Sequence, residues 1–314
     1  MKNSTTYLFP ITLTAFLFIV LIPYSAVAND SISYADFVAK HSCINTSEGP
    51  MRYRDEGKGH VIVMVHGVAS SGWMYRSLLN EYSQKGFRVI VPDMLGFGES
   101  DCPDGTIIYD PQHHANRLLE LLNSLSITEC NFVTQAEGSL WIAPILRDHP
   151  EMVDKTVLIN PLLNAAGLTN KNQLSIGLLA KMGVFNMNWR AASYVKNYLG
   201  DNDGSDKLSE KEKKGYLAGI EANKFAGIIG HFEYLTSREF LTQFHYPSSE
   251  NALLMIVGSA SQSLNWENQY QNLNWPPASS KDTVDKIENG SELLIEDFPT
   301  LMAEKLLTFL GERQ

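Results

Sequence analysis

The stretch VIVMVHG, at residues 61–67, decides the fold of this chain. Its first five residues form an unbroken apolar run, which is typical of a strand buried on both faces of a parallel sheet. A second run, RVIV, follows at residues 88–91, and residues 73–82 between the two runs have the spacing of a helix. Gly86 follows where that helix would end. The sequence therefore predicts a strand, a helix and a second strand within residues 51–92.

Short apolar runs continue along the chain in alternation with stretches of helical character. They lie at residues 131–134, 156–159, 253–257 and 293–295. Because strands alternate with helices, we predict an α/β fold with a doubly wound, mostly parallel sheet.

A helical cap is predicted between Pro161 and Pro247, where the apolar runs stop. The tetrapeptide SEKE at residues 209–212 has the pattern of a capping box at a helix start. These helices form either a lid over a pocket or ordinary decoration, and we expect a lid because ligands of such sheets bind outside the carboxyl ends of the strands. The predicted division is a signal peptide at residues 1–28, a core at 29–161 and 248–314, and a cap at 162–247.

The first residues have the layout of a secretory signal peptide. Lys2 precedes an apolar stretch at residues 7–22 and the small residues AVA at 26–28. An uncleaved anchor is the alternative, but Pro10 interrupts the stretch, which falls short of the roughly 20 apolar residues of a membrane span. We expect cleavage after Ala28, a periplasmic or secreted protein, and no stable membrane anchor in the mature chain.

The composition fits a globular protein of one large or two small domains, with 314 residues of which 44% are hydrophobic. The net charge of -10 argues against a nucleic-acid partner, which requires clustered basic residues. Cys43, Cys102 and Cys130 are an odd number, so they form either one pair or none, and the sequence leaves both open. Since their spacing indicates no metal site, we expect neither a metal nor a cofactor.

Two motifs carry a resemblance to a known family. VHG at residues 65–67 follows one predicted strand, and VPDMLGFGES at residues 91–100 contains the end of the next. Over nearly the whole mature chain, the sequence resembles the α/β-hydrolase superfamily, in the cap-bearing group of esterases, epoxide hydrolases and haloalkane dehalogenases. Gly96 and Gly98 lack the third glycine and the following helix of a dinucleotide-binding motif.

The resemblance places an oxyanion hole at two backbone N–H groups. His66 and Gly67 begin a loop, and the first N–H group is that of the next residue, Val68. The second is the N–H of the residue after the nucleophile position, which is Glu137 here. For His66 itself we expect a structural role in shaping the loop. These backbone donors persist whatever side chains surround them, so we expect them to bind a ligand oxygen.

The nucleophile turn of the family reads TQAEG at residues 134–138, with Ala136 where the reactive side chain belongs. Ser139 lies about one helical turn further on, so we expect its oxygen to point elsewhere. An alanine excludes both a serine nucleophile and the aspartate that a dehalogenase or epoxide hydrolase requires.

The acid and base positions are also substituted. The acid position falls on Ser261, and the alternative position at the end of the preceding strand falls on Asn160, which leaves Glu267 as a loose candidate. The base position falls on Asp297, and the last histidine of the chain is His245. We therefore expect a degenerate triad.

Three other features leave alternatives open. Glu137 and Asp297 either form a carboxylate pair, in which one acts as acid and the other as base, or have separate structural roles. In the second case Glu137 packs at the elbow and Asp297 caps a helix that begins near Pro299. The adjacent His113 and His114 point apart on a helix and favour an exposed helix start over a metal site. The aromatic residues within 263–277 either stack on a planar ligand or hold a long loop.

We expect a non-catalytic binding module for a small molecule or a partner. The predicted ligand site lies under the cap and comprises His66, Gly67, Val68, Glu137 and Trp141. The alternative is a weak or non-standard hydrolase that acts on small ester-like substrates. The oligomeric state stays open.

Overall fold

Eight strands form one sheet in the order β1-β2-β4-β3-β5-β6-β7-β8. The strands β1 and β2 pair antiparallel, as do β2 and β4, whereas the pairs from β4 through β3 to β8 are parallel. This confirms the predicted α/β fold with a mostly parallel sheet. The bounds are β1 Ser42–Thr46, β2 Gly49–Gly57, β3 His60–Val65, β4 Phe87–Pro92, β5 Cys130–Gln135, β6 Val153–Ile159, β7 Ala252–Gly258 and β8 Thr283–Ile287.

The fold is known from a computed structural model. It describes residues 32–103, 107–164, 176–179, 182, 188–199, 208–223, 225–244, 246–247, 251–260 and 283–311. All of them belong to one compact unit, Ile32–Gln314. The predicted signal peptide and anchor alternative, Ser261, Glu267 and the aromatic segment 263–277 lie outside the described residues.

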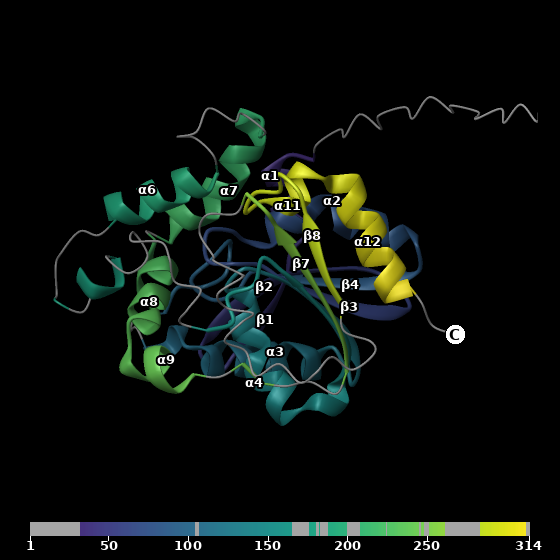
Figure 1. The fold of residues 1–314 in the computed structure, drawn as a ribbon, viewed down its shortest axis with the longest axis horizontal. Coiled ribbons are helices and arrows are strands. Elements are labelled where there is room, and N and C mark those ends of the chain that lie inside the picture. The colour runs from purple at the N-terminus through teal and green to yellow at the C-terminus, as the bar shows by residue number, and fades with distance from the viewer. Residues whose placement is uncertain are drawn as a thin grey trace, which may run out of the picture. The chain divides into compact units, whose positions relative to one another are not determined.

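Helices cover both faces of the sheet. Figure 1 shows α2 and α12 on one face, where the hydroxyl of Tyr82 donates to Ala303 O at 2.6 Å, and α3 and α4 on the other. The central strands are buried on both sides because of this cover, and every residue of β5 is buried. The bounds are α1 Tyr34–Val38, α2 Arg76–Gln84, α3 Pro111–Ser124, α4 Gly138–Asp148, α11 Leu294–Asp297 and α12 Pro299–Gly311, with 3-10 turns at Gly72–Tyr75, Ile107–Tyr109 and Pro150–Met152.

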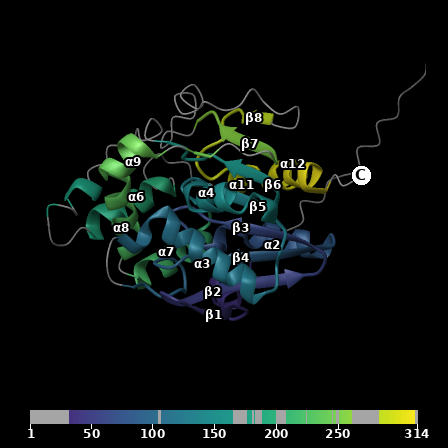
Figure 2. The same ribbon diagram turned by 90° about the horizontal axis from the view of Figure 1, so that it is seen from below.

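The cap region contributes helices in its described part. They are α6 Asn188–Tyr198, α7 Glu210–Ala222, α8 Ala226–Leu235 and α9 Arg238–Gln243. They gather beyond one end of the sheet (Figures 1 and 2). The predicted capping box is confirmed, since the Ser209 and Glu212 side chains bond each other's backbone N–H at the start of α7. Among the helices of the described chain, none is long and apolar enough to cross a membrane.

The predicted strand at residues 293–295 was wrong. Leu294 begins the short helix α11, and the last strand is β8, whose sequence TVDKI carries two charges. A three-residue apolar run cannot by itself distinguish a strand from a buried helical turn. An edge strand such as β8 needs no apolar run, because only part of its surface is covered.

All three cysteines are free. Cys43 is exposed, Cys102 is partly buried and Cys130 is buried. Of the two possibilities that the sequence left open, the structure therefore has the unpaired thiols.

Candidate functional site

The turn between β5 and α4 has the geometry of a nucleophile elbow. β5 ends at Gln135, α4 begins at Gly138, and Ala136 between them has φ 47°. A left-handed conformation of this kind costs a non-glycine residue roughly 1–3 kcal/mol. The turn also passes close to the neighbouring strand, since a Cβ at Gly138 would lie 2.6 Å from His66 O and 2.7 Å from Val65 O. The elbow backbone is thus intact, with a methyl group at its apex.

The two N–H groups that the resemblance assigns to an oxyanion hole face a side chain of the protein itself. Val68 N–H donates to Glu137 Oε2 at 3.3 Å, and the Glu137 carboxylate also accepts from its own backbone N–H. These are the two donors that the sequence assigned to a ligand oxygen. A ligand oxygen can reach them only if the Glu137 side chain moves aside.

The Glu137 carboxyl is buried at the start of a helix. Only 2% of the residue is exposed, and burial raises the pKa of Glu137, while the two N–H donors act in the opposite direction. The N-terminal end of α4 adds a favourable field for a negative charge. A buried carboxyl on backbone donors thus stands beside Ala136.

Ser139 does not replace the nucleophile. Its Oγ lies 2.8 Å from Ala136 O and 2.7 Å from Leu162 O and donates its proton to one of them. The residue is fully buried. The prediction that its oxygen points away from the site is confirmed.

His66 holds the loop in shape, as the sequence predicted. Its Nδ1 lies 2.7 Å from Gly67 O, and its Nε2 accepts from Met94 N–H at 3.0 Å. The ring is therefore neutral with its proton on Nδ1, and burial lowers the pKa of His66 to about 4.

Trp141 is packed among other rings. It is fully buried and its Nε1 donates to His231 Nδ1 at 3.3 Å, which links α4 to the cap helix α8. The ring stacks on His114 at 4.4 Å and meets His66 and Phe97 at 5.5 Å and 5.4 Å. Its predicted contact with a ligand stays a prediction.

The predicted exposed helix start at His113 and His114 was wrong. A helix does begin near these residues, since α3 starts at Pro111 after its N-cap Asp110. However, His114 is fully buried against Trp141, and His113 bonds the Glu48 carboxylate. The two rings diverge because neighbouring helical positions face different directions. His113 therefore contacts Glu48, and His114 contacts Trp141.

The last loop, residues 288–293 between β8 and α11, contacts the end of β5 through Glu292. Glu292 O accepts from Gln135 Nε2 at 2.5 Å. Asp297, which the sequence placed at the base position, ends α11, and its Oδ2 accepts from Ser291 N–H at 2.7 Å. The helix α12 begins at Pro299, as expected. The bond from Ser291 N–H to Asp297 connects α11 to the loop before it. The residue of this loop whose carbonyl contacts Gln135, directly before Ala136, is thus Glu292, which sequence reasoning missed.

Asn160 occupies the alternative acid position and carries no charge. It directly follows β6 and has φ 43°. Its Oδ1 accepts from Gly258 N–H at 2.8 Å, and its Nδ2 donates to Ser291 O at 2.9 Å. The same nitrogen lies 3.4 Å from Glu292 O. Asn160 therefore joins two strands to the last loop as a neutral residue.

The cap brings a tyrosine to the elbow. Tyr198, at the end of α6, has its hydroxyl 3.3 Å from Gln135 Nε2. The pKa of Tyr198 is raised, first by burial and then by the nearby carboxylates of Glu137, Glu292 and Glu296, although the Gln135 bond opposes this. Nothing in the sequence around α6 marked Tyr198 as part of the site.

A buried ion-pair network lies between the cap and the core. Arg76 Nη1 donates to Glu296 Oε1 at 2.5 Å, and its Nη2 donates to Glu212 Oε1 at 2.9 Å. The Tyr216 hydroxyl donates to Glu296 Oε1 at 2.7 Å. The network joins α2, α7 and α11, and the sequence did not indicate it because its members are far apart along the chain.

The sheet and the turn at Ala136 have the arrangement of the α/β hydrolase fold. The chain belongs to the α/β hydrolase fold family, whose model matches residues 60–286. A haloalkane dehalogenase of Mycolicibacterium paratuberculosis is 32% identical over 118 residues, which are 37% of this chain and 39% of that protein. An epoxide hydrolase of Caballeronia sordidicola is 29% identical over 121 residues, or 38% and 37% of the two chains. The matches thus span well under half of these relatives.

Solved structures share the whole fold. The epoxide hydrolase of Bacillus megaterium, in complex with an inhibitor, has a TM-score of 0.69 and 17% identity, with 86% of this chain and 100% of that chain covered. The enol-lactonase of Burkholderia xenovorans LB400 has a TM-score of 0.66 and 16% identity over the same shares. At such identities the likeness concerns the fold alone.

Proposed function

We propose that this protein binds a small molecule or a partner and has no Ser-His-acid chemistry. The observation that supports this most is the Glu137 carboxylate on Val68 N–H, next to the methyl group of Ala136. Hydrolysis in this fold needs a nucleophile at the elbow and free donors for the oxyanion. Here an alanine stands at the position of the nucleophile, and the donors already face the Glu137 carboxyl group.

The proposed binding region lies between the elbow and the cap helices. Glu137, Glu292 and Tyr198 converge there, and a ligand that displaces the Glu137 side chain would gain both oxyanion donors. A partner protein is the other candidate occupant. Large apolar side chains that are more than half exposed support it in the cap, namely Leu178, Met182 and Trp189 at 57%, 69% and 62%.

A panel of nitrophenyl esters, epoxides and haloalkanes tests the absence of chemistry, because the relatives are named for the last two substrate classes. We expect the purified protein to release product no faster than buffer. Turnover that is lost on heat denaturation of the protein would overturn the proposal.

A second candidate function is a weak hydrolase in which Glu137 acts as a general base on water. The buried carboxyl with a raised pKa supports it, since such groups are typical of acid-base catalysis. Glu137→Gln keeps the shape and removes the base. If the parent turns over a substrate of the panel and Glu137→Gln does not, this candidate replaces the first.

The proposal includes export. The layout of residues 1–28 supports cleavage after Ala28. Amino-terminal sequencing of the protein from its natural host is expected to begin at Asn29, and a chain that begins at Met1 would contradict export by this route.

A further inference from the structure

A cluster of three side chains lies at the amino ends of three strands. His60 is the first residue of β3, Glu129 directly precedes β5, and Asp154 is the second residue of β6. These strands are neighbours and parallel in the sheet. Since Ala136 follows the carboxyl end of β5, the cluster lies at the edge of the sheet opposite the elbow.

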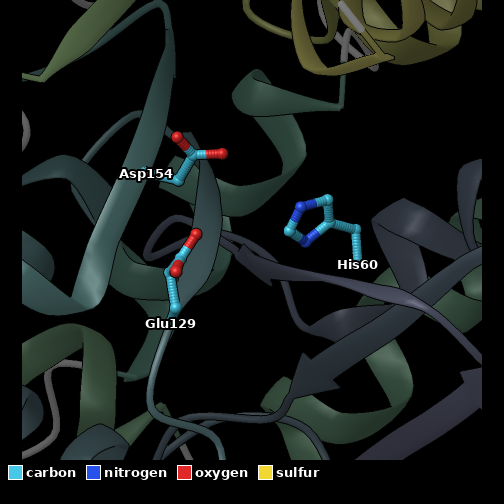
Figure 3. Close-up of side chains that lie close together, drawn as sticks. All are labelled: His60, Glu129 and Asp154. Atoms are coloured by element: carbon cyan, nitrogen blue, oxygen red, sulfur yellow. The ribbon is translucent and has the colours of Figure 1, made fainter. Parts of the chain in front are cut away.

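The three side chains turn toward a common space (Figure 3). One donor atom of each, an imidazole nitrogen or a carboxylate oxygen, lies within 4.8 Å of the donor atoms of the other two. His60 and Asp154 are partly buried and Glu129 is exposed. Bonds from Zn²⁺ to nitrogen and oxygen are about 2.0–2.2 Å long, so ligands of one ion lie about 3–4 Å apart. Small side-chain rotations therefore suffice to close the cluster on an ion.

The donor types select among metals. Ca²⁺ and Mg²⁺ are bound almost entirely by oxygen, whereas one imidazole with two carboxylates suits Zn²⁺ and similar divalent transition metals.

We propose that His60, Glu129 and Asp154 bind one divalent transition-metal ion, with water at its remaining positions. The sequence predicted no metal, because the three ligands come from separate strands and have no motif spacing. The bound ion joins the amino ends of β3, β5 and β6. Binding to the folded chain alone raises its stability with increasing metal concentration.

Isothermal titration of the metal-free full-length protein with ZnCl₂ tests the site. We expect one Zn²⁺ per chain and a melting temperature that rises with Zn²⁺. His60→Gln and Asp154→Asn are each expected to weaken binding by at least about tenfold. Glu129→Gln, at an exposed position, tests the same ligand set with the least risk to folding.

The matched control is His149→Gln. His149 lies 3.6 Å from Glu151 in an exposed histidine–carboxylate pair. The described residues bring no third ligand to this pair, and its loss should leave Zn²⁺ affinity unchanged. Two results would overturn the proposal. One is the absence of binding at millimolar Zn²⁺, and the other is equal affinity in the parent and in Glu129→Gln.

Discussion

The Glu137 carboxylate lies against the Val68 N–H, one of the two groups that we predict to bind a ligand oxygen. It lies 3.3 Å from Val68 N at the start of α4, and the residue is 2% exposed. Backbone donors left without an acceptor in a buried site cost about 1–3 kcal/mol each. One side chain therefore both stabilises the loop and covers these N–H groups.

Glu137→Ala should open a carboxylate site. We expect a lower melting temperature than in the parent, because two buried N–H groups lose their acceptor. Acetate is expected to restore part of the loss in a concentration-dependent way, as measured by thermal melts at constant ionic strength. Glu137→Gln keeps an acceptor oxygen in place and should not respond to acetate, and an equal acetate effect in both variants would contradict the account.

Elements far apart in the chain are joined by Arg76. Its guanidinium connects α2 to Glu296 in α11 and Glu212 in the cap helix α7, and its side chain is 6% exposed. Removing one partner of a buried ion pair leaves an uncompensated charge. The cap is thus held to the core by charge as well as by packing.

Arg76→Ala should cost about 3–5 kcal/mol of unfolding free energy. Urea denaturation measures it. The control Arg147→Ala removes an exposed pair with Asp148, in which the arginine is 59% exposed, and should cost about 0–1 kcal/mol. Equal losses in the two variants would show that the Arg76 network is not a significant contributor to stability.

The elements that could be predicted are those whose signal is local. The run at residues 61–65 marks β3 because both of its faces are covered, and the turn around Ala136 follows from one strand and one helix in succession. β8 and α11 escaped prediction because an edge strand and a single helical turn have no distinctive periodicity. The sequence placed the base position at Asp297, whereas Glu292 is the residue whose carbonyl contacts Gln135. Contacts between distant segments, such as those of Arg76 and Tyr198, left no trace in local patterns.

The whole molecule contains several buried neutral histidines. Burial lowers the pKa of His41 and His66 to about 4, that of His231 to about 3, and that of His114 well below its ordinary value. The folded state thus binds fewer protons than the unfolded state between these values and 6.5. The stability that these groups contribute is fully present above pH 6.5 and is lost as the pH falls through this window. Burial raises the pKa of Asp93 to about 7. The stability that Asp93 contributes is therefore present at low pH and is lost as the pH rises through this value.

His231→Phe isolates one histidine from these opposing contributions. Between pH 6 and pH 4, the unfolding free energy of the parent should fall more steeply than that of the variant, by about 1.4 kcal/mol per pH unit at most. Urea denaturation at a series of pH values measures both slopes. Parallel curves would mean that His231 takes up its proton equally in the folded and unfolded chains.

We propose that the hydrolase frame is intact, that its nucleophile is absent and that Glu137 fills its oxyanion hole. Rebuilding the site tests it most directly, through nitrophenyl acetate hydrolysis by Ala136→Ser/Asn160→Asp/Glu292→His with and without Glu137→Ala. We predict no turnover by the parent, and a rate in the rebuilt chain that rises on the order of 10²-fold when Glu137→Ala frees the oxyanion donors. The matched variant with Asp297→His in place of Glu292→His should stay inactive. Turnover by the parent, or equal rates with and without Glu137, would contradict the account.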